Sequence, residues 1–313
     1  MGSAAAWALA ERGADVTIYE QFDHEHTRGS SHGRTRIFRL AYPEPHWVEL
    51  AEEALAGWRD VEQRAGRPLL AFYGLVELCT RVEVTSSDVL AARGIEHRLL
   101  TRDELRAHRV ELPEGWVALW QQDGGVVLAD DARRAFLEVA QPQWKNEHRV
   151  ESLDDLDAEV VVVTAGAWIT KLIPDLPLSV TRETVAYFAR DGAPMPSVVE
   201  LNDETRHHAM YALHDSKYGM KAGAHRGGHE ADPDVEEPAD PALVDRISGW
   251  VRERFPDIDP NPVAAESCLY TSTEDESFVL ERRGRLVVGS ACSGHGFKFA
   301  PAVGRRLAEL ALG

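Results

Sequence analysis

Residues 1–20, "MGSAAAWALAERGADVTIYE", decide the fold class of this chain. The alanine-rich apolar stripe in residues 3–12 predicts a helix, and Gly13 favours its end. The segment "DVTIYE" that follows predicts a buried strand ending in an acid. A helix that opens at Gly2 and a strand that closes at Glu20 are typical of the second half of a β-α-β dinucleotide-binding unit.

Gly2 and Glu20 have two interpretations. A glycine at the start of a helix lets the backbone approach a pyrophosphate at the positive helix end. An acid after the next strand can accept hydrogen bonds from ribose hydroxyls. On the residues alone, the pair fits equally a glycine that packs a helix on a strand and a glutamate at the surface.

Composition restricts the kinds of partner. The chain has 313 residues and a net charge of −18 at pH 7, which argues against a nucleic acid or an anionic membrane as partner. No apolar run is long enough to span a bilayer, so we expect no membrane association. Cys79, Cys268 and Cys292 form no CxxC pair, which favours a reducing, cytoplasmic location.

Helix and strand signals alternate along the rest of the chain. Helices are predicted over residues 44–66, 129–140 and 241–255, and after Thr101, a candidate N-cap with Glu104 three residues later. Residues 71–80 and the apolar run of residues 158–168 predict strands. Residues 285–312 predict a strand, a glycine-rich turn and a helix. Strand–turn–helix signals at both ends and in the middle predict an α/β fold with a discontinuous nucleotide-binding domain.

The expected domain boundaries follow from that order. Residues 1–70, 125–172 and 262–313 are expected to form the nucleotide-binding domain, and residues 71–124 and 173–261 a second, substrate domain inserted in it.

Two stretches combine cations with small residues. "TRGSSHGRTRIFRLAY", residues 27–42, carries Arg34, Arg36 and Arg39, whose planar guanidinium groups suit a bound carboxylate. The alternative is a basic loop or edge strand in solvent. "YGMKAGAH", residues 218–225, places Lys221 in a small, apolar strand, where a buried ammonium could stabilise developing negative charge. The alternative is an edge lysine that reaches solvent.

Two later stretches carry further candidates. In "ESCLYTSTEDESFVLE", residues 266–281, Cys268 and Tyr270 face one side of a predicted strand, although a lone cysteine also fits a small buried apolar residue. "SACSGHGFKFAPAVG", residues 290–304, precedes a helix with Pro301 in its first turn, which favours an anion at the helix start. The polar run "DHEHTRGSSH", residues 23–32, matches no metal-ligand spacing, so we expect no metal.

These stretches, in this order, resemble the monomeric sarcosine oxidase family, which includes N-methyl-tryptophan oxidase. The family consists of FAD-dependent amine oxidases of the D-amino-acid-oxidase-like superfamily. The resemblance is carried by "GSSHGRTRIFRLAY", "VVVTAGAW", "YGMKAGAH", "SCLYTSTEDESFVLE" and "SGHGFKFAPAVG". It implies a Rossmann-like FAD domain of the glutathione-reductase type, interleaved with an antiparallel-sheet α+β substrate domain.

The resemblance also implies roles for individual residues. Cys268 matches the cysteine that carries the flavin covalently, and Lys221 the lysine beside the flavin ring that activates oxygen. Arg39 and Lys298 match the cations that hold the substrate carboxylate. Tyr211, Tyr270 and His225 match residues of the cavity wall. The flavin-contacting set is Gly2, Glu20, Ser30, Ser31, Thr35, Arg36, Cys268, Gly294, His295, Gly296, Phe297 and Lys298.

The implied reaction is FAD-dependent oxidation of a secondary amine by O2, giving an imine and then an aldehyde, a primary amine and H2O2. The expected partners are a small amine and O2, and the expected state is a monomer. Family members start with a strand and a full G-x-G-x-x-G, whereas Met1 and Gly2 fall on its last two positions, so we expect a truncated nucleotide unit. A non-catalytic remnant that cannot hold FAD, and a dehydrogenase with another electron acceptor, are the alternatives.

Overall fold

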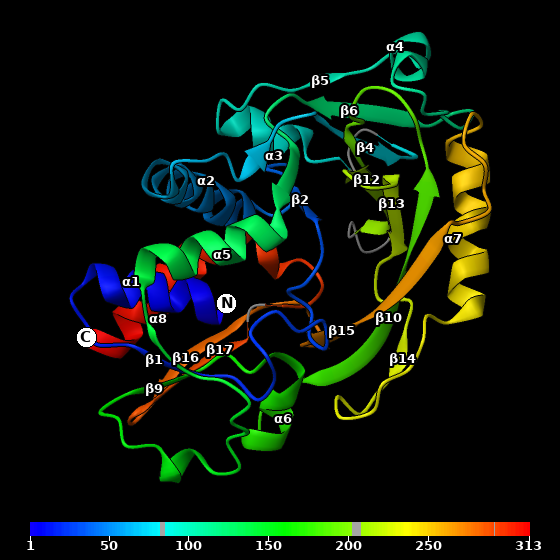
Figure 1. Cartoon of the computed structure of the whole chain (residues 1–313). Helices are drawn as coiled ribbons and strands as arrows, with labels where there is room; N and C mark the ends of the chain where they lie inside the picture. Colours follow the sequence, from blue (N-terminus) through cyan, green and yellow to red (C-terminus); the bar gives the residue numbers. More distant parts are fainter. Residues whose placement is uncertain (82–84, 202–207, 291) are drawn as a thin grey trace.

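The computed structural model describes residues 1–81, 85–201, 208–290 and 292–313. Figure 1 shows a large sheet on one side and a stack of helices with small sheets on the other. The helices in the described ranges are α1 (Gly2–Glu11), α2 (Pro45–Ala65), α3 (Ser87–Ala92), α4 (Arg102–Ala107), α5 (Ala129–Ala140), α6 (Ile169–Leu172), α7 (Pro241–Arg254) and α8 (Ala300–Leu312).

The large sheet has nine strands in the order β14-β10-β13-β12-β11-β4-β6-β5, with β15 also paired to β10. Its neighbours are antiparallel except β11 and β4, which run parallel. Helix α7 packs on this sheet through Ile247, Trp250 and Val251, which meet Phe188 and Met220 in one apolar core. The strands are β4 (Leu75–Cys79), β5 (Arg98–Leu99), β6 (Val117–Gln121), β10 (Ser179–Ala189), β11 (Ser197–Leu201), β12 (His208–Asp215), β13 (Gly219–Ala224), β14 (His229–Glu230) and β15 (Ala264–Ser272).

Three small sheets lie beside the helix stack. Strand β1 (Thr17–Tyr19) pairs in parallel with β8 (Gln143–Lys145). Strand β9 (Val161–Val163) pairs in parallel with β17 (Leu286–Ser290), which pairs with β16 (Val279–Arg283). Strand β7 (Gly125–Leu128) lies between β2 (Thr35–Phe38) and β3 (Leu70–Ala71).

The prediction of a buried strand after Gly13 is wrong in one respect. Strand β1 forms, but Thr17 and Tyr19 are exposed, since within the described chain its only strand partner is β8. A strand with one neighbour keeps an open edge and buries little of its side chains. Residues 71–80 also differ from one continuous strand: the chain breaks between β3 and β4 at Gly74, whose φ is 90°.

Helices α1, α2, α5 and α8 pack around a tryptophan-rich core (Figure 1). Trp7 and Trp58 are fully buried and contact the ring of Phe136 from α1 and α2. Helices α1 and α8 approach closely at Gly304, because a Cβ there would lie 2.5 Å from the Ala4 carbonyl oxygen. This packing fixes the start of α1 in space.

Several local predictions are confirmed. Helix α5 has the predicted bounds, and α4 begins with the capping box in which Thr101 and Glu104 exchange hydrogen bonds. The expected domain boundaries stay a prediction, and β15 links the two expected domains because it pairs over its whole length with β10. Within the described residues, every helix is too short or too polar to cross a membrane.

Candidate cofactor and substrate site

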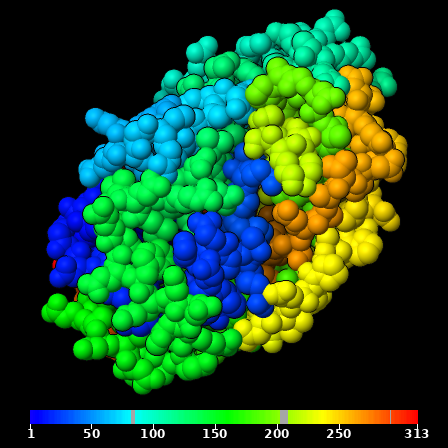
Figure 2. All heavy atoms as spheres, viewed as in Figure 1, coloured from blue at the N-terminus to red at the C-terminus, as the bar shows by residue number. Residues whose placement is uncertain are grey.

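A cavity of about 1010 Å³ lies between helix α1, the small sheets and the large sheet. Ligand sites commonly have volumes of about 300–1,000 Å³, so this central cavity is large enough for an extended ligand. Figure 2 shows the blue loop that follows β1 beside the orange strand β15 on one face of the molecule. Ser30 of that loop donates a hydrogen bond to the carbonyl oxygen of Leu269 and joins the two segments across the cavity.

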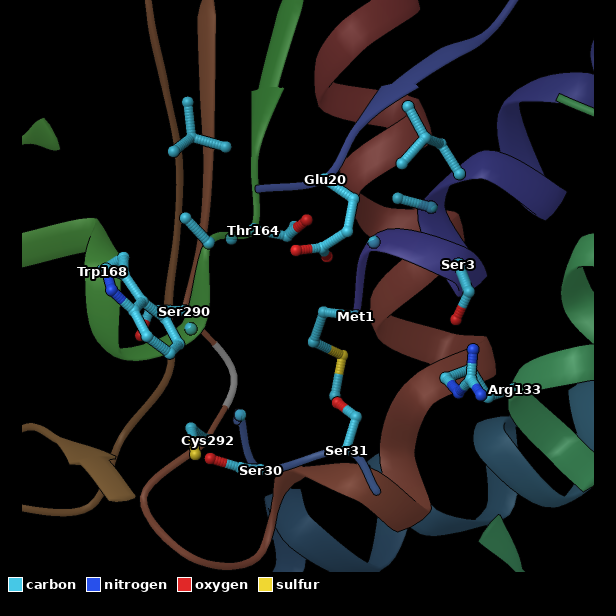
Figure 3. Close-up of a pocket in the computed structure, with 18 of the residues that line it drawn as sticks. Met1, Ser3, Glu20, Ser30, Ser31, Arg133, Thr164, Trp168, Ser290 and Cys292 are labelled. Carbon is cyan, nitrogen blue, oxygen red and sulfur yellow. The ribbon is translucent and has the colours of Figure 1, made fainter. Parts of the chain in front are cut away.

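The start of α1 and the end of β1 form the first end of the cavity. Gly2 opens the helix, and a Cβ there would lie 2.9 Å from Thr164 Oγ1 beyond β9. Glu20 follows β1, and its carboxylate accepts a hydrogen bond of 3.0 Å from the Phe22 amide. Figure 3 shows Glu20, Thr164 and Met1 around one hollow. The positive helix end and the acid therefore face the same space, as the sequence predicts.

The Met1 amino group lies inside this end of the cavity. Burial lowers its pKa from the ordinary 8.0. Both neighbouring strands also line the hollow: Thr17–Tyr19 on one side and residues 161–163 on the other. The first end of the cavity thus holds a buried amine and two strand edges.

The loop of residues 30–36 forms the middle of the cavity and is held by Arg36. Its guanidinium donates hydrogen bonds of 2.9 Å to the carbonyl oxygens of Thr35 and Ser30, and it lies 5.7 Å from the ring centre of Phe297. Arg34 leaves the cavity and pairs with buried Asp215 at 2.8 Å. The arginines of this stretch therefore have different partners: Arg36 holds the loop, and Arg34 pairs with Asp215.

Cys268 faces the cavity from β15, together with Tyr270. Burial raises the pKa of the Cys268 thiol, and the positive charges of Lys221 and Arg36 oppose this rise. Only the thiolate is a strong nucleophile. A bond from Cys268 to a ligand would therefore depend on those two cations.

Lys221 and Tyr211 face the cavity from neighbouring strands of the large sheet. Burial, and then the positive charge of Arg36, lower the pKa of Lys221 to about 7. Tyr211 lies opposite Gly223 in the β12–β13 register, and a Cβ on Gly223 would come within 2.5 Å of the Tyr211 hydroxyl. Glycine at this position therefore leaves the room that the tyrosine ring occupies.

Arg39 and Lys298 form the second end of the cavity, with Tyr42 between them. Lys298 Nζ donates hydrogen bonds to the Tyr42 hydroxyl at 2.9 Å and to the His295 carbonyl oxygen at 2.8 Å. The Arg39 guanidinium lies 4.0 Å from the centre of the Tyr42 ring. Burial, followed by the charge of Arg39, holds the pKa of Lys298 well below its usual 10.5.

The turn that carries Lys298 is anchored from α2. Trp58 Nε1 donates a hydrogen bond of 2.8 Å to the Lys298 carbonyl oxygen, and the short helix Gly296–Phe299 leads directly into α8. Gly294, His295, Gly296 and Phe297 of this turn line the cavity as expected.

His225 lies behind the cavity wall. Its ring centre is 5.7 Å from that of Tyr270, and its Nε2 is 3.2 Å from Glu276 Oε2. Gly294 has a φ of 74°, and a Cβ there would lie 2.2 Å from Tyr270 and 2.6 Å from His225. His225 therefore supports the Tyr270 ring from behind. Of the other residues for which the resemblance implies a role, all line the cavity, whereas Arg34 does not.

Sequence reasoning missed Tyr42 and Glu77. Tyr42 ends the stretch "TRIFRLAY", in which the arginines are the stronger signal. Glu77 is fully buried in β4 and lies 3.5 Å from Arg39. The signal for it was a carboxylate inside the apolar run "AFYGLVELCT", because a buried acid needs a partner.

A cavity with a helix start and an acid at one end and buried cations at the other is typical of a protein that binds a dinucleotide beside a small anion. A family model described as FAD dependent oxidoreductase matches residues 1–310. The chain belongs to this family.

Known proteins resemble the chain over nearly its whole length. It is 32% identical to the peroxisomal sarcosine oxidase of Homo sapiens, covering 99% of this chain and 89% of that protein. It is 28% identical to the monomeric sarcosine oxidase of Bacillus sp. (strain B-0618), covering 100% of this chain and 90% of that protein. A solved structure of NikD, an unusual amino acid oxidase, superposes with a TM-score of 0.85 at 25% identity, covering 99% and 91% of the chains.

The residues of the central cavity fit FAD. A pyrophosphate would be held at the start of α1, where Gly2 leaves no Cβ against Thr164, and a ribose would be held by the Glu20 carboxylate. The loop of residues 30–36, Cys268 and the glycine-rich turn also line the cavity and would hold the flavin ring.

Proposed function

We propose that this protein oxidises a secondary amine of an N-methyl or cyclic amino acid, using FAD and O2. The amine loses two electrons and two protons and becomes an imine, which water hydrolyses to an aldehyde and a primary amine. Oxygen receives the electrons and protons and becomes H2O2. The observation that carries the proposal is the buried pair Arg39 and Lys298 at the end of a cavity that fits FAD.

FAD supplies the acceptor for the hydride equivalent. Its nucleotide part would lie in a Rossmann-like domain against Gly2 and Glu20. Its flavin part would contact the residues that the resemblance implies, with a covalent link through Cys268 as part of the proposal.

Arg39 and Lys298 bind and orient the substrate. Arg39 offers a guanidinium and Lys298 an amine to a carboxylate. Tyr42 contacts both side chains, and Trp58 holds the Lys298 carbonyl oxygen. Holding the carboxylate fixes the C–H bond that reacts, which removes the entropic cost of orientation from the reaction step. Tyr211 and Tyr270 form the apolar wall around the amine.

Lys221 holds positive charge at the oxygen step. It lies buried in the cavity wall without an acid in hydrogen-bond range among the described residues, so its charge is available to the oxygen as this gains electrons. We further propose a cytoplasmic monomer, although the human relative is named as peroxisomal.

Two measurements test the proposal. The purified chain is precipitated with acid and inspected for yellow colour and flavin fluorescence in the protein band. Flavin retained after denaturation supports the link to Cys268, and a colourless protein that binds no added FAD supports the non-catalytic alternative. Peroxide is then assayed with N-methylglycine; turnover with a dye but without peroxide supports a dehydrogenase.

A further inference from the structure

The cation that faces the substrate already has a carboxylate partner inside the protein. Glu77 Oε1 lies 3.5 Å from Arg39 Nη1, and both side chains are buried. Ser86 fixes the carboxylate of Glu77 with a hydrogen bond of 3.0 Å from its amide and one of 2.8 Å from its hydroxyl. Arg39 lines the central cavity, whereas Glu77 lies behind it and does not.

Glu77 lowers the net positive charge of the substrate end of the cavity. The charge of Arg39 is compensated by Glu77, and the hydrogen bonds of Lys298 go to neutral oxygens of Tyr42 and His295. A carboxylate that enters must share Arg39 with Glu77, and the two anions repel each other in a medium of low polarity. An uncharged group in the same position meets no such repulsion.

We propose that Glu77 is a specificity-determining residue that weakens carboxylate binding at Arg39. It thereby admits amines that carry an amide or another uncharged polar group in place of the carboxylate. This inference rests on the proposed function for its substrate class, and on the Glu77–Arg39 geometry for its effect on anion binding.

The variant Glu77→Gln removes the charge and keeps an acceptor for Ser86. The expected result is a fall of about tenfold in the KM for N-methylglycine, because one unit charge near its carboxylate is removed. The KM for N-methylglycinamide, in which a neutral amide replaces the carboxylate, should stay unchanged. An unchanged ratio of the two KM values would overturn the inference. If the wild-type protein oxidises neither compound, the proposed function fails.

A second measurement does not need turnover. The Kd of acetate is measured by thermal shift and, with FAD bound, by flavin absorbance. Glu77→Gln is expected to bind acetate about tenfold more tightly while its own Tm falls, because Arg39 loses its internal partner. A purely structural role for Glu77 predicts a lower Tm with weaker or equal acetate binding, which would contradict the inference.

The chain offers a matched control. Glu200 lies on strand β11, next to β4, and forms a partly buried pair at 2.7 Å with Arg254 of α7. It does not line the cavity. Glu200→Gln is expected to lower the Tm without changing the Kd of acetate. If Glu77→Gln does not fold, Ser86→Ala tests the opposite direction: without the serine hydroxyl, Glu77 Oε1 is free to pair with Arg39, and acetate should bind more weakly.

Discussion

The two ends of the central cavity are built in different ways. At the substrate end, Lys221 and Tyr211 stand on the paired strands β13 and β12 of the nine-stranded sheet, and Tyr270 stands on β15 of the same sheet. At the nucleotide end, β1 and β9 are three-residue strands, each with one strand partner in the part of the chain described. The substrate end therefore holds its geometry through continuous strand pairing, while the nucleotide end depends on what fills the hollow between two strand edges.

Because the two ends are built differently, we expect one end to control the reaction rates and the other to control retention of the cofactor. A ligand that binds only the folded state stabilises it in proportion to its affinity and concentration. We expect FAD to stabilise the nucleotide end more than the substrate end, because the buried Met1 amine and the open edges lie at the nucleotide end. Changes at the substrate end should alter rates, and changes at the nucleotide end should alter cofactor content and stability.

The largest expected effect concerns Lys221. Lys221→Met is expected to slow the reaction of the reduced enzyme with O2 by about 10²-fold or more, because it removes the buried positive charge from the oxygen step. Reduction by the amine should change little. Because the pKa of Lys221 is lowered to about 7, the wild-type oxygen step should slow as pH rises above about 7.

Stopped-flow measurement of the two half-reactions checks this prediction. Lys217→Met, in the turn between β12 and β13 and outside the cavity lining, is the matched control and should leave both rates unchanged. Equal slowing of both half-reactions in Lys221→Met would sink the oxygen role.

Arg39→Ala is expected to have the next largest effect. It removes the carboxylate anchor and leaves Glu77 buried without its cation, at a cost of about 3 kcal/mol. The KM for N-methylglycine should rise about 100-fold, and the Tm should fall. Steady-state kinetics with N-methylglycine and its amide check this role of Arg39, since the KM for the amide should rise much less. An unchanged KM for N-methylglycine would count against carboxylate binding by Arg39.

The sequence predicted the helices and strands better than it predicted which of them are buried. The apolar spacing of residues 129–140 and the Thr101–Glu104 pair are local signals, and helices α5 and α4 follow them. The exposure of β1 had no local signal, because burial of a strand depends on which strands lie beside it. Lys221 stood out as a cation in an apolar strand, and the structure buries it.

The site could be predicted where one stretch carried several signals, and much less where two distant stretches meet. Glu77 and Arg39 lie 38 positions apart, so no spacing rule links them. His225 was expected on the cavity wall, but the wall residue Tyr270 comes from another strand and covers it. Pairings of this kind are set by the order of strands in the sheet, which the sequence pattern does not specify.

A strand that fills the hollow between β1 and β9 should stabilise the fold. An apolar segment of about six residues added before Met1 would turn the buried amine into an amide and could pair with the edges of β1 and β9. Burial of two apolar side chains contributes about 3 kcal/mol, and the Tm should rise by about 5 °C. FAD content on purification should rise with it.

A glycine–serine extension of the same length is the control for strand pairing. It relieves the buried charge but offers no apolar side chains, so it should give only part of the rise in Tm. Equal Tm and equal FAD content in both extended proteins would show that the hollow does not accept a strand.

The smallest expected effect is the pH dependence caused by the Met1 amine. Burial lowers its pKa below 8.0 in the folded state, so between that lowered value and pH 8 the unfolded chain binds more protons than the folded one. The free energy of unfolding therefore rises with pH in this window, by at most about 1.4 kcal/mol per pH unit for a single group. Lys221 and Lys298, whose pKa values are also lowered, add slopes of the same sign.

Urea unfolding at pH 6, 7 and 8 is compared between the chain and its glycine–serine extension. The two lysines are common to both proteins, so the difference in slope gives the contribution of the Met1 amine. The extended protein should show the shallower rise, and identical slopes would mean that the Met1 amine is already in solvent.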